Sequence, residues 1–181
     1  MTNSSPSQLL QASPLASVGA LSVPTPSTDK ILITAVDPGK MCGVGIFQWT
    51  ATYRKFSSIE LTPIVAATYV RRHLEEMSGW VVAVERFTPD HRTASVQLDA
   101  IEVIGMLRYV VETSIRMDHR FDLQSRSEAK KIGGTQVLKK LGWHKNTKDG
   151  HANDAANHVL LALLRRFPRD YASLMDELQS T

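Results

Sequence analysis

Two stretches of the sequence have the character of buried strands that end in an acidic residue. Residues 31–37 are mostly apolar and partly β-branched up to Asp37, and a Pro-Gly pair then stops the run. Residues 80–85 have the same character and end in Glu85. If a crossover helix places these strands side by side and parallel, both carboxylates lie at one edge of a sheet. Open α/β sheets bind ligands at that edge, so these residues are the first candidates for chemistry.

A third group of suitable side chains begins at His151. His151, Asp154 and His158 follow at spacings that place them on one face of a helix, near its start. Two carboxylates close to each other raise one pKa strongly unless divalent cations neutralise them. Carboxylate oxygens with an imidazole suit Mg²⁺ or Mn²⁺. The catalytic metal ligands that we predict are Asp37, Glu85, His151 and Asp154, with His158 as a buried, hydrogen-bonded support.

Such a site is suited to the hydrolysis of phosphodiesters. Two cations about 4 Å apart hold the attacking water and the leaving oxygen on opposite sides of the phosphorus. In this arrangement Asp37 bridges both ions, and Glu85 and Asp154 bind one each. His151 is either a direct ligand or a residue that orients water in the outer shell.

Each of these residues also has an ordinary structural explanation. Asp37 alone can start an Asx-type turn before the Pro-Gly pair. Glu85 alone can be a surface acid that pairs with Arg86 or Lys40. His151 can be a solvent-exposed residue at the start of a helix. The coupled positions of Asp37 and Glu85 favour the metal site over these separate roles.

The elements that must position these residues alternate along the chain. Short connections join the first strand to strands at 43–49 and 52–61, which predicts an antiparallel meander. The remaining pattern predicts helices and one last short strand, as follows: helices at 63–77, 93–116, 152–166 and 171–178, and the strand at 121–124. The leucines expected to face inward from the third helix are Leu160, Leu161, Leu163 and Leu164. This order is that of an α/β protein with a mixed sheet and helices on its faces.

The predicted helix 93–116 carries more apolar residues than one buried stripe needs. A helix that is apolar on more than one side must bury two faces. One face can lie on the sheet, and we expect the other to contact a second copy of the chain in a homodimer.

Composition limits the class of protein. The chain has 181 residues, of which 43% are hydrophobic and 22% charged, as in one globular domain of ordinary size. Cys42 is the only cysteine, so a disulfide within the chain and a cysteine zinc cluster are both excluded. No apolar run approaches the roughly 20 residues of a membrane-spanning helix, and the N-terminus lacks the pattern of a secretion signal. We therefore expect a cytoplasmic protein with no membrane partner.

Charge is unevenly distributed along the chain. Residues 1–28 contain no acidic or basic side chain and are rich in Ser, Thr and Pro, which predicts a disordered arm before a folded domain at 29–181. Residues 120–149 contain eight lysines and arginines against three acidic residues, a local net charge of +5. A basic surface of this kind attracts phosphate backbones, although a lysine run is also often just a solvated face.

Together, the three acidic motifs resemble a known family. Residues 33–39 (ITAVDPG), 82–87 (VAVERF) and 151–155 (HANDA) are similar to motifs of the RuvC-like Holliday junction resolvases of the RNase H superfamily. The resemblance covers roughly residues 30–166, and small phage-encoded members look most similar. It implies an RNase H-like five-stranded mixed sheet flanked by helices. It also implies a homodimer that makes paired nicks across a four-way DNA junction with two Mg²⁺ or Mn²⁺ ions, in the host cytoplasm if the chain is phage-encoded.

The resemblance assigns roles to individual residues. By motif position, Asp37, Glu85 and Asp154 match three of the family's acidic ligands. The fourth ligand is Asp in many members and His in some, and here it is His151. An imidazole suits Mn²⁺ better than it suits Mg²⁺, so this position favours Mn²⁺.

The resemblance also implies contacts with DNA. Lys130 and Lys131 match the family's basic segment near the scissile phosphate, and Lys139 and Lys140 follow in similar order. Phe87 is the nearest match to the aromatic residue that wedges against junction bases, at a spacing one residue shorter. The alternative for Phe87 is a place in the core.

Other functions share part of this pattern. A broader nuclease for branched DNA, flaps or RNA–DNA hybrids would use the same metals without the junction preference. A catalytically silent module that binds DNA junctions would not need the three acids, which are all retained. The phosphate loop of actin-like and sugar-kinase ATPases also begins with Asp-x-Gly after a strand. Those folds need two such halves, and this chain has one Asp-Pro-Gly motif.

Overall fold

The computed structural model describes residues 28–87, 94–116 and 118–180, and for residues 94–97 only the course of the backbone. The predicted uncharged arm, residues 1–28, lies outside the described residues except for Thr28. Within the described part of the chain, no helix is long and apolar enough to cross a membrane.

A five-stranded mixed sheet forms the centre of the molecule, in the order β3-β2-β1-β4-β5. Its strands are β1 Lys30–Asp37, β2 Cys42–Thr50, β3 Arg54–Leu61, β4 Val81–Glu85 and β5 Arg120–Gln124. β2 pairs antiparallel with both β1 and β3, whereas β4 lies parallel to both β1 and β5. The predicted meander and mixed sheet are confirmed, and β1 and β4 are neighbours.

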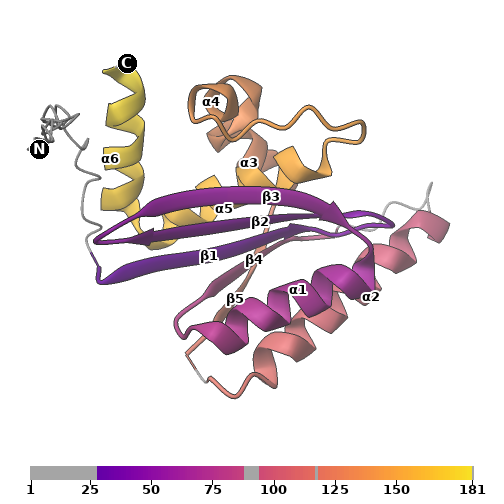
Figure 1. The fold of residues 1–181 in the computed structure, drawn as a ribbon. Coiled ribbons are helices and arrows are strands. Elements are labelled where there is room, and N and C mark those ends of the chain that lie inside the picture. The colour runs from indigo at the N-terminus through magenta and orange to yellow at the C-terminus, as the bar shows by residue number, and fades with distance from the viewer. Residues whose placement is uncertain (1–27, 88–93, 117, 181) are drawn as a thin grey trace, which may run out of the picture.

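Helices cover both faces of the sheet (Figure 1). Two of them lie on one face: α1 Pro63–Glu76 and α2 Ala94–Glu112. The others lie on the opposite side: α3 Arg126–Ile132, α4 Gly134–Lys140, α5 His151–Arg166 and α6 Pro168–Gln179. The helices predicted at 63–77, 152–166 and 171–178 correspond to α1, α5 and α6, although α6 begins earlier than expected.

Two segments differ from the prediction. The helix expected at 93–116 ends at Glu112, and the Thr113 hydroxyl then donates a hydrogen bond of 2.7 Å to the carbonyl of Tyr109. The basic segment after β5 is two short helices, α3 and α4, that meet at Gly133. A Cβ at Gly133 would lie 2.1 Å from Oδ1 of Asn157, so the close approach to α5 requires glycine there.

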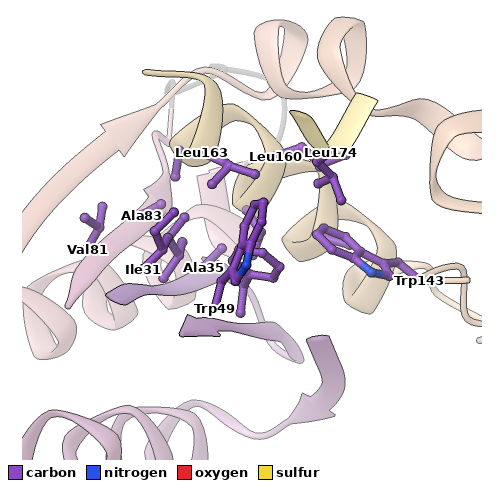
Figure 2. Packing of buried hydrophobic residues seen from close by; sticks show 14 of the residues in the cluster. Ile31, Ala35, Trp49, Val81, Ala83, Trp143, Leu160, Leu163 and Leu174 are labelled. Atoms are coloured by element: carbon purple, nitrogen blue, oxygen red, sulfur yellow. The ribbon is translucent and has the colours of Figure 1, made fainter. Parts of the chain in front are cut away.

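β1 is buried on both faces because an apolar cluster lies on each side of the sheet. On one side, Ile31 and Ala35 pack in a cluster with α5 and α6 (Figure 2). On the other side, Leu32 and Val36 pack in a cluster with α1 and α2. All four side chains are at most 1% exposed, which explains the continuous apolar sequence of this strand. Because both faces of β1 are packed, the position of Asp37 at the end of this strand is fixed.

α5 packs against the sheet along most of its length. Of the leucines expected to face inward, Leu160, Leu161 and Leu163 are buried, but Leu164 is only partly buried. Small residues in the first half of the helix, Ala152 among them, are also buried and allow a close approach to β1 and β2.

α2 buries one face and exposes another. Val103, Leu107 and Val111 are buried in the cluster that also contains residues of α1 and the sheet. Leu98 and Tyr109 are 61% and 66% exposed, so part of the apolar surface of this helix is uncovered in the single chain. The homodimer stays a prediction.

Candidate active site

β1 and β4 bring two carboxylates to the same edge of the sheet. Val36 lies opposite Val84 in the parallel pairing, so the next residues, Asp37 and Glu85, end adjacent strands. Asp37 is 5% exposed and the Glu85 side chain is 15% exposed. Both carboxylates are therefore largely removed from water, which is costly unless each has a partner.

The first turn of α5 reaches this edge because β2 carries a glycine there. Gly43 lies opposite Asp37, and a Cβ on it would be 1.9 Å from the carbonyl oxygen of His151. Only glycine allows backbones to approach so closely. The Glu60 carboxylate accepts a hydrogen bond of 3.2 Å from the amide of Ala152, which satisfies one of the free amides at this helix start. These contacts seat His151 beside the end of β1.

Asp37 and His151 form the first pair of the site. Nδ1 of His151 donates a hydrogen bond of 2.7 Å to Oδ2 of Asp37. Burial raises the pKa of Asp37 from 3.8 to about 6; the hydrogen bond from His151 lowers it, and the nearby Glu85 and Asp154 carboxylates raise it. At neutral pH Asp37 thus carries its charge at a cost in free energy that a bound cation would remove.

Glu85 is held by a buried histidine. Nε2 of His158 lies 3.0 Å from Oε2 of Glu85, and His158 is 1% exposed. The side-chain amide nitrogen of Gln124 faces α5. It donates hydrogen bonds to Nδ1 of His158, at 2.9 Å, and to the carbonyl of His158, at 3.1 Å. Nδ1 of His158 thus accepts a hydrogen bond and carries no proton. The ring proton is therefore on Nε2, which donates a hydrogen bond to Glu85. The partner of Glu85 is this histidine, rather than Arg86 or Lys40.

Asp154 is held by two cations from α3. Nη2 of Arg126 donates to Oδ2 of Asp154 at 2.9 Å, and Nζ of Lys130 lies 3.2 Å from Oδ1. Nε of Arg126 also lies 4.0 Å from Oε2 of Glu85, which places the guanidinium between the two carboxylates. Arg126 was not among the site residues predicted from the sequence. Its position just after β5, whose last residue pairs with Glu85, is a signal that could have found it.

Two adjoining clefts open the site to solvent. Asp37, Glu85 and His151 line a cleft of about 580 Å³. A second cleft of about 730 Å³ is lined by Lys130 and shares Glu85 and Phe87 with the first. Phe87 therefore lies at the rim of the acidic group and not in the core.

The other predicted DNA contacts lie further from the carboxylates along α3 and α4. Lys131 is exposed on α3, and Lys139 and Lys140 are exposed in the last turn of α4. None of the three is among the described residues that line the two clefts. The predicted residues that the structure does bring together are Asp37, Glu85, His151, Asp154, His158, Lys130 and Phe87.

The side chains at this edge are of types that suit a divalent cation, but one of them, Asp154, is paired with Arg126 and Lys130. Three carboxylates and an imidazole are ligands that Mg²⁺ and Mn²⁺ accept. Over residues 28–87, 94–116 and 118–180, no three His, Cys, Asp or Glu side chains are positioned to grip a metal ion together. Arg126 and Lys130 occupy the oxygens of Asp154 instead. The donor types therefore suit such an ion, but to bind one the described carboxylates and imidazole would have to draw closer together, and Arg126 and Lys130 would have to leave Asp154.

Comparison with known proteins supports the fold. Neither the protein-family models nor the curated proteins give a match to this sequence. Among solved structures, T. thermophilus RuvC in complex with a Holliday junction substrate matches with a TM-score of 0.51 and 11% sequence identity. The match covers 71% of this chain and 89% of that one. At this identity the likeness shows the fold alone, and the predicted α/β RNase H-like architecture is confirmed.

Proposed function

We propose that this protein is a divalent-metal-dependent endonuclease that resolves four-way DNA junctions. The observation that carries the proposal is the gathering of Asp37, Glu85 and Asp154, from three different elements, at one open edge of an RNase H-like sheet. A carboxylate such as Asp37, whose pKa is raised by burial and by neighbouring carboxylates, is expected where a site is built to take cations. Lys130 and Arg126 beside them provide positive charge for a phosphate backbone.

Each residue of the site has a distinct task in this proposal. Two Mg²⁺ or Mn²⁺ ions would supply the activated water and the charge that stabilises the leaving oxygen. Asp37, which lies centrally and most deeply, would bind both ions, and Glu85 and Asp154 one each. His151 adds an imidazole ligand next to Asp37. His158 keeps the Glu85 carboxylate in one orientation through its hydrogen bond of 3.0 Å.

The substrate class follows from the surface around the site and from the structural likeness. Lys130 and Lys131 would contact the DNA backbone near the scissile phosphate, with Lys139 and Lys140 further along it. Phe87 lines both clefts, which supports a role for it as the residue that wedges against unpaired bases. The RuvC structure that shares this fold holds a Holliday junction substrate, which favours a four-way junction as the target.

We also propose that two copies act together, because resolving a junction needs a nick on each of two strands. The exposed apolar side chains on α1 and α2 offer a surface for this contact. Ile64 is 73% exposed, Leu98 61% and Tyr109 66%. Apolar groups gathered on one face in this way are typical of an interaction site. Residues 29–181 would form the nuclease domain, with residues 1–28 as a separate arm.

A cleavage assay on defined DNAs tests the proposal. Synthetic four-way junctions, three-way junctions, linear duplexes and an RNA–DNA hybrid are incubated with the protein and either Mg²⁺ or Mn²⁺. We expect paired nicks in the four-way junction, and no cleavage by the Asp37→Asn variant even though it still binds the junction. Preferential cleavage of the hybrid or of three-way junctions would replace the proposal with a broader nuclease. Tight junction binding without cleavage under any metal would leave only a binding module.

A further inference from the structure

Arg126 occupies the space between two of the proposed metal ligands. Its guanidinium nitrogens lie 2.9 Å from Oδ2 of Asp154 and 4.0 Å from Oε2 of Glu85. Among the described ion pairs, it is the residue that reaches both carboxylates, whereas Lys130 is paired with Asp154. A guanidinium and a divalent cation cannot share the same oxygens at close range, because like charges repel. A metal ion that takes Oδ2 of Asp154 must therefore displace the guanidinium of Arg126.

We propose that Arg126 is a built-in counter-ion that competes with divalent metal for Glu85 and Asp154, and that it moves onto a DNA phosphate when the metal binds. This inference rests on the proposed metal-dependent nuclease function. It goes further in assigning to one side chain both the stability of the metal-free site and a contact with the substrate. Metal and DNA would then bind cooperatively, since the metal releases the group that the phosphate needs.

The position of Arg126 allows this movement. It is the first residue of α3, and its side chain is 58% exposed, whereas the side chains of Glu85 and Asp154 are each 15% exposed. A long exposed side chain at a helix start can turn without disturbing the core. Arg126 lines both clefts, and the one of about 730 Å³ extends from Glu85 to Arg86 and Ser127, so the guanidinium has room to turn away from Asp154.

The chemistry of arginine suits both positions. Its planar guanidinium has several donors and remains charged at all ordinary pH values, and it pairs well with either carboxylate or phosphate oxygens. The pKa of Arg126 is raised by its hydrogen bond to Asp154 and by the nearby carboxylates, although burial acts to lower it. The guanidinium therefore stays charged beside the carboxylates and can pair with a phosphate in the same state.

Calorimetric titration with Mn²⁺ alone, in the absence of DNA, tests the competition. The proteins compared are the wild type, Arg126→Gln and Arg165→Gln. Arg165 is the matched control, because it forms an exposed ion pair of 3.0 Å with Glu128. Neither of these residues is among the described residues that line the two clefts. Removing Arg126 should tighten Mn²⁺ binding roughly two- to fivefold, the effect of losing one partly exposed competing ion pair. Arg165→Gln should leave it unchanged, and Arg126→Lys should give an intermediate affinity.

Junction binding provides a second readout with the opposite sign. With Ca²⁺ as a probe metal that supports binding, Arg126→Gln should bind a labelled four-way junction several-fold more weakly than the wild type. In EDTA the difference should shrink, because the wild-type guanidinium is then held by the carboxylates. A merely structural role for Arg126 would not tighten metal binding and weaken DNA binding at the same time.

The outcomes separate this inference from the function on which it rests. If the wild type binds Mn²⁺ but Arg126→Gln binds it equally or more weakly, the competition is wrong and the metal site stands. If neither protein binds Mn²⁺, the metal-dependent function is wrong, and the inference falls with it. If metal binding tightens but junction affinity with Ca²⁺ does not change, the transfer of Arg126 to a phosphate is overturned.

Discussion

Replacing Asp37 by asparagine should stabilise the metal-free protein while it abolishes cleavage. Burial is the main reason why the pKa of Asp37 is raised from 3.8 to about 6. At pH 7.5 the folded protein must therefore keep this carboxylate ionised in an unfavourable place. A shift of about two pKa units corresponds to about 3 kcal/mol, since each unit is about 1.4 kcal/mol. A neutral amide of nearly the same shape removes that cost.

Only part of this free energy is gained. The oxygen of the new amide can still accept the hydrogen bond from Nδ1 of His151, which is 2.7 Å from Oδ2 of Asp37. Its NH₂ group, however, needs a partner in a buried place, and its desolvation costs about 1–2 kcal/mol. We therefore expect a net gain of about 1–2 kcal/mol in the free energy of unfolding. For a domain of this size that raises the melting temperature by roughly 2–8 °C.

The gain should depend on pH in one direction. Between about pH 4 and pH 6 the folded wild type holds a proton on Asp37 that the unfolded chain releases. Wild-type stability therefore falls as the pH rises through this window, by the linkage of proton binding to folding. The variant does not lose this stability. Its advantage should be complete above about pH 7, and at pH 4 it should give way to a deficit of about 1–2 kcal/mol, the cost of the buried NH₂ group.

Thermal unfolding in EDTA, followed by circular dichroism at pH 4, 5.5 and 7.5, measures the effect. Asp122→Asn is the matched control, because it removes a carboxylate that is paired with Arg166, and it should not be stabilising. Added Mn²⁺ should then raise the melting temperature of the wild type but not that of Asp37→Asn. The reasoning is refuted if Asp37→Asn is no more stable than the wild type at pH 7.5, or if its gain is the same at every pH.

Other parts of the structure give predictions that simple measurements can check. Replacing Lys130 and Lys131 together by alanine should weaken junction binding and reduce the salt dependence by about one unit of slope per lost phosphate contact; an unchanged slope would show that they point elsewhere. Gly43→Ala should cost about 1–3 kcal/mol in urea unfolding, because its Cβ would lie 1.9 Å from the His151 carbonyl oxygen, and a neutral effect would contradict that contact. His119 accepts a hydrogen bond of 3.2 Å from the backbone amide of Trp80, and burial lowers its pKa below 6.5. As the pH falls below 6.5 the unfolded chain therefore takes up a proton on this histidine before the folded protein does, and the free energy of unfolding should fall. The difference in stability between the wild type and His119→Gln should therefore change in that range, and a constant difference would rule this out.

Local patterns in the sequence were sufficient for the sheet and for the positions of its acids. A strand that is buried on both faces, like β1, has no place for a charged side chain in its middle, so Asp37 marks its end. The same reasoning found Glu85 at the end of β4. Helical spacing placed His151 and Asp154 on one face of α5, and in the structure both face the same edge of the sheet. These features depend on residues close together in the chain, so a single sequence contains the information.

Only the tertiary structure decided which partners hold those acids. Arg126 is one of eight basic residues in the segment 120–149, and its place just after β5 points to the site only once β5 is known to pair with β4. Gln124 was expected as the end of a strand, but its amide fixes the proton of His158 and through it the orientation of Glu85. Gly43 was expected as an ordinary strand residue, although it is the point where α5 touches the sheet. Hydrogen bonds and ion pairs act over a few ångströms, and those distances are set by strand register and helix packing between segments that lie far apart in the chain.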